Sequence, residues 1–242
     1  MSAGSRRAQE ARQQVAAAAK RQRERRIAVV AALVALVLLV AGGIAFQAWR
    51  TRRAPDAPPA STGASLAPVA IADGKPILLG QSEAPVTLAL YEDFHCPHCA
   101  DFEEAYGPVL TAARDGGKAA IELHPMSFID AGSASAANAM ACAAEAGFGS
   151  AYYDGLFANA TLRWSDDQLI ELANQVAPGV KEPFSSCVTS RAHAGWVASI
   201  NAAADASGVT STPTLFLDGA RVDLATVTPE ALQTKIDEAA TT

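Results

Sequence analysis

Two cysteines with two residues between them occur in the sequence FHCPHCADF, which covers residues 94–102. Cys96 and Cys99 enclose Pro97 and His98. Cysteines at this spacing serve as a redox-active dithiol, as metal ligands or as a structural disulfide. A loop closed over so few residues removes little chain entropy, which argues against a purely structural bond. Thiol–disulfide exchange and metal binding therefore remain as the chemical interpretations.

The surrounding pattern predicts that the pair begins a helix. Helical periodicity starts after Cys96, which makes Cys96 the N-cap residue and Pro97 the first helical residue, a position that favours proline. A thiolate at Cys96 can then accept hydrogen bonds from the N–H groups of His98 and Cys99 at the positive end of the helix dipole. The His98 ring can add a further bond or charge. These features predict a lowered pKa for Cys96, with Cys96 as the nucleophile and Cys99 as the resolving cysteine.

Acidic residues near the pair oppose that shift, because negative charge raises the pKa of a thiol. They are Glu92, Asp93, Asp101, Glu103 and Glu104. We therefore expect an oxidising pair that is milder than the strongest known oxidases.

The metal interpretation uses His95, Cys96, His98 and Cys99 as ligands. A closed zinc site usually draws on two separated ligand pairs. Elsewhere the sequence offers only Cys142 and Cys187, which are isolated, with His193 near one of them. A membrane-tethered metal-binding module is therefore the alternative from a different functional class.

The N-terminal region contains twenty consecutive uncharged residues, Ile27–Phe46. A helix of this length spans about 30 Å, the thickness of a bilayer core. A cleaved signal peptide is the alternative, although its apolar region is usually only ~7–15 residues long. Eight basic residues precede the segment, so we expect a cytoplasmic N-terminus and an extracytoplasmic C-terminal part, where disulfides persist.

Four regions are predicted along the chain, which has a net charge of −6. They are a basic cytoplasmic tail (1–26), a transmembrane anchor (27–49), a linker rich in Pro and Ala (50–80) and a folded domain (81–242). The basic tail adjoins a membrane segment, so it does not indicate nucleic-acid binding.

Within the folded domain, strands and helices alternate around a block of helices. Strands are expected at Val86–Glu92, Ala119–His124, Pro213–Gly219 and Ala220–Leu224. Helices are expected at Pro97–Arg114, Ala131–Ala146, Asp166–Ala177, Pro183–Ser207 and Pro229–Ala239. This order predicts an α/β core with a helical insertion at about 128–205.

Two stretches resemble a known family. YEDFHCPHC (Tyr91–Cys99) and GVTSTPTLFLDG (Gly208–Gly219), together with the helical insertion, resemble DsbA-type thiol:disulfide oxidoreductases, especially the membrane-anchored actinobacterial group. The resemblance extends from about Gln81 to the C-terminus. It implies a thioredoxin fold with an inserted helical subdomain, preceded here by one transmembrane helix. It also implies a monomer that needs no cofactor.

The resemblance also assigns residues. Thr212-Pro213 is expected to be a cis peptide beside the active cysteines, where it binds substrate. Cys142 and Cys187 are expected to form a structural disulfide, which would add about 4 kcal/mol of stability; two buried free thiols are the alternative. The family often has a buried acid six residues before the first active cysteine, and Leu90 occupies that position here.

The expected function is oxidation of cysteine pairs in secreted or membrane proteins through a mixed disulfide at Cys96. The resemblance implies reoxidation by a quinone-linked membrane partner. A disulfide reductase or isomerase of the same fold is the alternative within this class, and the reduction potential separates the two directions.

Overall fold

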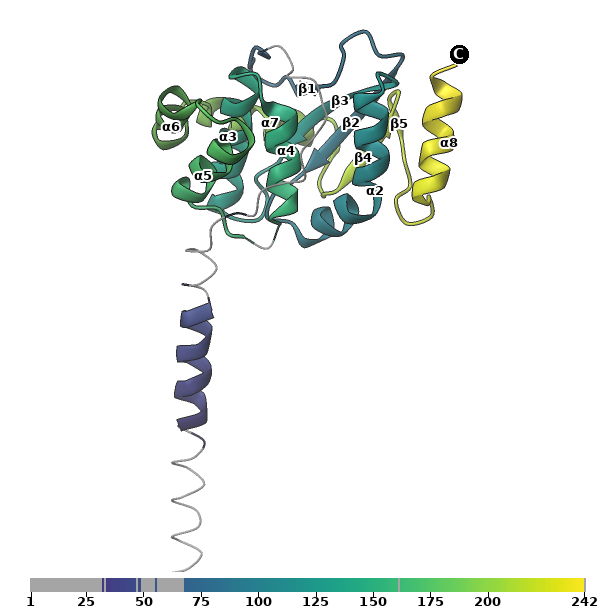
Figure 1. Ribbon diagram of the computed structural model, residues 1–242. Helices are drawn as coiled ribbons and strands as arrows, with labels where there is room; N and C mark the ends of the chain where they lie inside the picture. Colours follow the sequence, from purple (N-terminus) through teal and green to yellow (C-terminus); the bar gives the residue numbers. More distant parts are fainter. Residues whose placement is uncertain are drawn as a thin grey trace, which may run out of the picture. The chain divides into compact units, whose positions relative to one another are not determined.

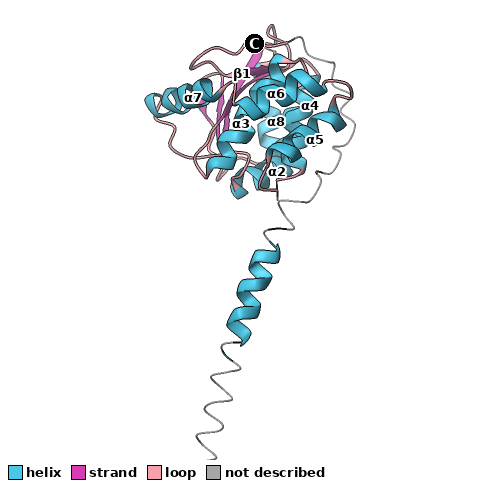
Figure 2. Ribbon diagram, turned by 90° about the vertical axis from the view of Figure 1, so that its left-hand side faces the viewer, coloured by secondary structure: helices cyan, strands magenta, loops and turns pink. Residues whose placement is uncertain are grey.

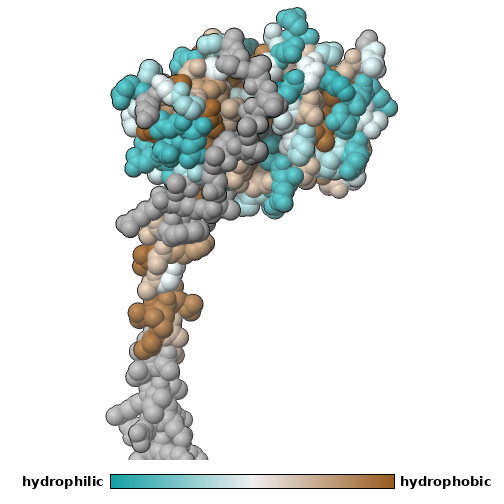
Figure 3. Space-filling model, viewed as in Figure 1, coloured by the Kyte–Doolittle hydropathy of each residue, from teal (hydrophilic) through white to brown (hydrophobic). Residues whose placement is uncertain are grey.

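The computed structural model describes residues 32, 34–46, 48, 55, 68–160 and 162–241, and it contains two units, Met1–Trp49 and Arg50–Thr242. In the first unit, residues 34–46 are helical and expose most of their large apolar side chains, which Figure 3 shows in brown. Among the described residues, no helix combines the length and the hydrophobicity that crossing a membrane requires. Part of the predicted span Ile27–Phe46 lies outside the described residues.

A five-stranded mixed sheet forms the centre of the second unit, in the order β1-β3-β2-β4-β5 (Figure 1). Its strands are β1 (Ile77–Leu79), β2 (Val86–Glu92), β3 (Ala119–Pro125), β4 (Thr214–Leu217) and β5 (Ala220–Arg221). The two central strands β2 and β3 are parallel, while the β1·β3, β2·β4 and β4·β5 pairs are antiparallel. Five large apolar side chains of β2 and β3 are at most 1% exposed, so the core is built on these two strands.

Seven described helices surround this sheet (Figure 2). They are α2 (Pro97–Asp115), α3 (Ala131–Glu145), α4 (Gly149–Ala158), α5 (Asp166–Val176), α6 (Lys181–Ser190), α7 (Ala194–Ala206) and α8 (Pro229–Ala239). Helices α3 to α7 all lie in the sequence between β3 and β4, which makes them the predicted helical insertion. Figure 1 shows them gathered on one side of the sheet, with α8 beyond β5 on the other.

Local sequence signals determine where several helices begin. Asp130 and Ser133 form a capping box at the start of α3, and Ser165 and Gln168 form another at α5. The Thr228 side chain accepts a hydrogen bond from the Ala231 N–H at the start of α8. These side chains satisfy N–H groups that otherwise have no partner within the helix.

Three elements differ from the sequence-based expectation. Strand β1 lies within the segment 50–80 that was assigned to the linker, and helix α4 was not expected. The single helix expected at Pro183–Ser207 is two helices, because Arg191 adopts a left-handed conformation (φ 55°) that ends α6. The boundaries of the other predicted elements agree to within three residues.

Candidate functional site

The loop between β2 and α2 carries Cys96 and is fixed by a buried carboxylate. Asp93 is 0% exposed and accepts hydrogen bonds from the backbone N–H groups of His95 (2.8 Å), Phe128 (2.8 Å) and Ile129 (3.1 Å). The Cys96 N–H also donates to the Asp93 carbonyl at 2.9 Å. One side chain thus joins the cysteine loop to the segment that leads into the insertion.

Cys96 is the N-cap residue of α2, as predicted, and Pro97 opens the helix. Its carbonyl accepts hydrogen bonds from the N–H groups of Cys99 (3.1 Å) and Ala100 (3.2 Å), which form the first turn. The expected capping bond to the Cys96 sulfur is absent from the structure. Instead the thiol donates to the Thr212 carbonyl at 3.7 Å, because a carbonyl oxygen can only accept.

Thr212 and Pro213 reach this sulfur from the other end of the domain. The Thr212-Pro213 peptide is cis, and β4 begins at the next residue. Thr214 is hydrogen-bonded back to the Ser211 carbonyl at 2.9 Å, which closes the turn. The structure therefore brings Thr212 and the adjacent Pro213 to Cys96, although 116 or more residues separate them from it in the sequence.

The two cysteines are free thiols in different surroundings. Cys96 is 7% exposed, whereas Cys99 is 0% exposed on the inner side of the first turn. Burial is the main cause of the raised pKa of Cys99, and the nearby Glu92 carboxyl raises it further. Cys99 is therefore held as a thiol, while Cys96 is the sulfur next to the surface.

Two carboxyl groups, the buried Glu92 and the half-buried Glu103, are joined by a tyrosine close to the cysteine pair. The Tyr153 hydroxyl is 2.5 Å from Glu92 Oε2 and 2.8 Å from Glu103 Oε1. A phenol has one proton to donate, so making both bonds requires a proton on one of the carboxyl groups. Burial raises the pKa of Glu92 well above its ordinary value and raises that of Glu103 from 4.5 to about 7. The group therefore shares a proton near neutral pH.

The sequence analysis did not identify Glu92 or Glu103 as the acid that lies near the cysteines. Leu90, at the position of the family acid, is 0% exposed and apolar. Glu92 follows it by two residues on β2, and alternate residues of a strand share a face. This alternation along β2 could have indicated that Glu92 points to the same side of the sheet as Leu90. Tyr153 comes from α4, a helix that was not expected.

The two histidines near the cysteines have different environments. The His98 ring is 84% exposed, and Asp101 Oδ2 lies 3.9 Å away from it. No described contact joins the His98 side chain to either sulfur, so its expected contact with a thiolate is absent from this structure. The His95 ring is buried, with Nδ1 2.7 Å from Asp130 Oδ1, and burial lowers its pKa.

These positions also test the proposed metal ligands. His95 turns towards Asp130 and His98 towards solvent, so the HCPHC side chains do not form a cluster of ligands. Within the described part of the chain, the one such cluster is Cys142, Cys187 and His193. The alternative of a metal-binding module built on HCPHC is therefore not supported.

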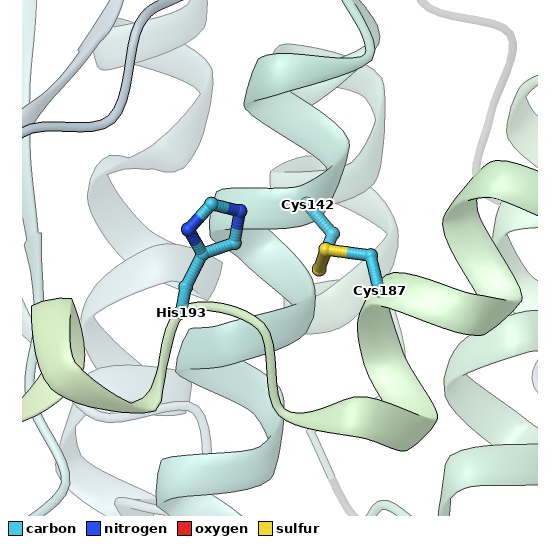
Figure 4. Close-up of side chains that lie close together, drawn as sticks. All are labelled: Cys142, Cys187 and His193. Carbon is cyan, nitrogen blue, oxygen red and sulfur yellow. A yellow bond between two sulfur atoms is a disulfide. The ribbon is translucent and has the colours of Figure 1, made fainter.

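Cys142 of α3 and Cys187 of α6 form a disulfide, with an S–S distance of 2.05 Å and Cα atoms 6.0 Å apart (Figure 4). The bond joins two helices of the insertion, and Cys142 is almost completely buried. It lies in a different part of the fold from the cysteine pair of α2.

Comparisons with known proteins agree with this fold and site. The thioredoxin family model matches residues 72–238, so the chain belongs to the thioredoxin family. The oxidised DsbA of Mycobacterium tuberculosis superposes with a TM-score of 0.59 and 25% identity, over 68% of this chain and 92% of that chain. The reduced disulfide bond oxidoreductase DsbG of the same organism gives 0.58 and 25%, over 71% and 95%.

A third structure, the thiol-disulfide oxidoreductase MdbA of Actinomyces oris, superposes with a TM-score of 0.58 and 24% identity, over 66% of this chain and 84% of that chain. The predicted relationship to DsbA-type proteins is confirmed, and so is the predicted enzyme class, thiol:disulfide oxidoreductase.

A curated relative is longer than this chain. The Na(+)/H(+) antiporter NhaA 3 of Salinispora tropica is 34% identical over 148 residues, which cover 59% of this chain and 21% of that protein. The matched part spans about a fifth of that relative. The antiporter activity in its name is therefore not assigned to this chain.

Proposed function

We propose that this protein is an extracytoplasmic thiol oxidase that introduces disulfides into secreted or membrane proteins. The observation that carries the proposal is the difference between its two sulfurs. Cys96 lies at a helix start beside the Thr212 carbonyl, and Cys99 is fully buried with a raised pKa. A pair of this kind can exchange with a foreign thiol at one sulfur and resolve with the other.

The reaction begins with a Cys96–Cys99 disulfide and a substrate dithiol. A substrate thiolate attacks the Cys96 sulfur, the Cys96–Cys99 bond breaks, and Cys99 leaves with the electron pair. Because the pKa of Cys99 is raised, the departing thiolate takes up a proton and becomes a thiol. The second substrate thiolate then attacks the substrate sulfur of the mixed disulfide and releases Cys96. The substrate loses two electrons and the protein gains them.

The carboxyl pair provides the proton for Cys99 in this scheme. After burial, the Glu92 carboxyl group has the largest influence on the pKa of Cys99, and it shares a proton with Glu103 through Tyr153. The proton returns to the pair when Cys99 is reoxidised. Such an internal donor matters because Cys99 has no exposed surface.

The substrate site includes Thr212 and Pro213. The Thr212 carbonyl faces the Cys96 sulfur, so an extended chain bound there presents its cysteine to the reactive atom. Main-chain pairing of this kind tolerates many sequences, which suits an enzyme with several substrates. Pro213 has no N–H that could compete for the sulfur.

The N-terminal segment is proposed to anchor the enzyme in the membrane, with residues 50–242 outside the cytoplasm. The exposed apolar side chains of residues 34–46 and the eight basic residues before Ile27 support this arrangement. A quinone-linked membrane protein is proposed to reoxidise the cysteine pair, and an anchored enzyme would lie close to such a partner.

Two cysteine variants test the catalytic roles. Cys99→Ala should accumulate mixed disulfides with substrate proteins that carry a disulfide, because the Cys96 thiolate attacks that bond and no Cys99 thiol remains to resolve the product. Cys96→Ala should trap none and should lose dithiol oxidation. Non-reducing electrophoresis followed by mass mapping measures both outcomes. If Cys99→Ala traps no partner, or if Cys96→Ala traps as many, the assignment of roles is wrong.

The reduction potential of the full-length protein determines the direction of the reaction. Equilibration with glutathione should give a value closer to about −120 mV, as in an oxidase, than to about −270 mV, as in thioredoxin. A value near the thioredoxin end would make the protein a reductase.

A further inference from the structure

Three metal-ligating side chains lie together outside the redox site. The ligand atoms of Cys142, Cys187 and His193 are all within 4.8 Å of one another, and Figure 4 shows the imidazole beside the disulfide. While the sulfurs are bonded to each other they are not thiolate ligands. We propose that reduction of the Cys142–Cys187 disulfide opens a zinc site formed by these three residues.

The chemistry needs a dithiol as reductant. The dithiol gives two electrons and two protons to the S–S bond and becomes a disulfide, leaving thiols at Cys142 and Cys187. Zn²⁺ then replaces both thiol protons, which pass to solvent. Thiolates at about 2.3 Å from a tetrahedral zinc are roughly 3.8 Å apart. The two sulfurs, now 2.05 Å apart, must separate to that distance, and the histidine ligand atom already lies within 4.8 Å of both. Side-chain rotation at the two cysteines supplies the separation.

The surroundings of His193 resemble the support of a metal-bound histidine. Its Nε2 is 3.1 Å from Glu145 Oε2 and lies on the side of the ring that faces the disulfide in Figure 4, so the ring must turn over about its Cβ–Cγ bond to present Nδ1 to the metal. Metal-ligating histidines usually donate their second N–H to a carboxylate in this way. Glu145 follows Cys142 by three residues on α3, so both lie on the same side of that helix.

Asn138 holds the three ligands in place from the turn of α3 before Cys142. Its side-chain oxygen accepts a hydrogen bond from the His193 N–H at 2.8 Å. Its amide nitrogen lies 3.8 Å from the Cys142 sulfur and 3.5 Å from the Cys187 carbonyl oxygen. Asn138 is 1% exposed, so this arrangement is part of the folded insertion and should persist when the S–S bond opens.

A zinc titration of the full chain tests the proposal. In a Cys96→Ser/Cys99→Ser background only the second cysteine pair remains. After reduction with a phosphine and its removal under nitrogen, zinc is titrated against a chromophoric chelator. We expect one equivalent of Zn²⁺ to bind the reduced protein and none to bind the unreduced protein at the same concentrations.

Matched histidine variants locate the site. His193→Ala in this background should weaken zinc binding at least about tenfold, which is the smallest loss expected when support of a metal ligand is removed. His98→Ala, which removes an exposed histidine elsewhere, should leave zinc binding unchanged. Equal affinities for the two variants would overturn the proposal.

The folded state of the reduced protein is followed by circular dichroism. If the reduced protein is folded and binds no zinc, the proposal is wrong. If reduction unfolds the protein, zinc must restore the native spectrum and raise the melting temperature, and failure to do so also overturns it. In the chain with all four cysteines, zinc should slow alkylation of Cys142 and Cys187 after reduction, as measured by mass mapping.

Discussion

At the scale of single residues, the site depends on which groups keep a proton. Cys99 and Glu92 are buried, Glu103 is half-buried, and Tyr153 links the two acids. Burial disfavours the charged form of Cys99 and of the two carboxyl groups, so these groups keep their protons more readily than exposed ones. This arrangement separates the two thiols chemically, although they are only three residues apart.

A neutral replacement of Glu103 should reduce the pH dependence of stability. The pKa of Glu103 is about 7 in the folded protein and 4.5 ordinarily. Between these values the folded state binds more protons than the unfolded state, so the unfolding free energy falls as pH rises. The loss is on the order of 1–3 kcal/mol. Glu103→Gln should therefore flatten the decline, as measured by urea unfolding from pH 4.5 to 7.5.

The adjacent exposed acid provides the control. Glu104→Gln changes the net charge by the same amount but removes no buried group, so it should keep the wild-type slope. A wild-type slope in Glu103→Gln would contradict the proposed sharing of a proton through Tyr153.

At the scale of elements, the sequence predicted the parts that carry their own local signals. The strand β2, the start of α2 at Pro97 and both bounds of α8 agree with expectation. Alternating or continuous apolar residues and N-terminal caps determine these elements locally. The separate positions of Cys142 and Cys187 on two helices were predicted for the same reason.

The missed elements depend on tertiary contacts. Strand β1 has three residues and exists through pairing with β3. Helix α4 contains Gly149 and Gly155 and has no capping side chain, so its residues favour a helix weakly. It is stabilised by packing, because Tyr152 and Leu156 are fully buried. Because Tyr153 lies on α4, the local sequence also could not predict that a tyrosine links the two carboxyl groups.

The contact between α3 and the cysteine loop can be tested at Gly132. A Cβ added there would collide with Cε1 of the buried His95 ring. Gly132→Ala should therefore displace the loop, lower the unfolding free energy by about 1–3 kcal/mol and alter the alkylation rate of Cys96. Gly195→Ala in α7 meets no atom within 4 Å and should be neutral or slightly stabilising. Both variants are measured by chemical unfolding and by the alkylation rate of Cys96. Equal unfolding free energies and alkylation rates in the two variants would exclude the collision at Gly132.

Removal of the second disulfide should affect stability more than exchange. The bond closes a loop with a sequence separation of 45 residues, so Cys142→Ala/Cys187→Ala should lower the unfolding free energy by about 4 kcal/mol. Dithiol oxidation at a temperature below the transition should stay within about twofold of wild type. Loss of oxidation in a variant that remains folded would instead assign a catalytic role to this pair.

At the scale of the whole molecule, charge and hydrophobicity are divided along the chain. The first 49 residues carry eight basic and two acidic residues, whereas residues 54–242 carry eight basic and twenty-three acidic residues. An anionic inner leaflet attracts a basic tail, and a negatively charged domain is not attracted to that surface. This distribution agrees with the proposed orientation.

The proposed anchor predicts how the protein fractionates. The full chain should remain in the membrane pellet after alkaline carbonate extraction, because an apolar helix of about twenty residues partitions into the bilayer. A chain that lacks residues 1–49 should appear in the supernatant. Labelling of cysteines by a membrane-impermeant reagent in intact spheroplasts should reach Cys96. Full-length protein in the carbonate supernatant, or Cys96 shielded in spheroplasts but labelled after lysis, would contradict the arrangement.

Asp93 couples the movement of two loops in the domain. Its carboxylate binds main-chain groups of the cysteine loop and of the loop that carries Phe128 and Ile129, the two exposed large apolar side chains in the described part of residues 68–241. Any displacement of the Phe128–Ile129 segment is therefore passed through the Asp93 hydrogen bonds to the loop that carries Cys96. The reactive sulfur and this apolar surface are then expected to shift together.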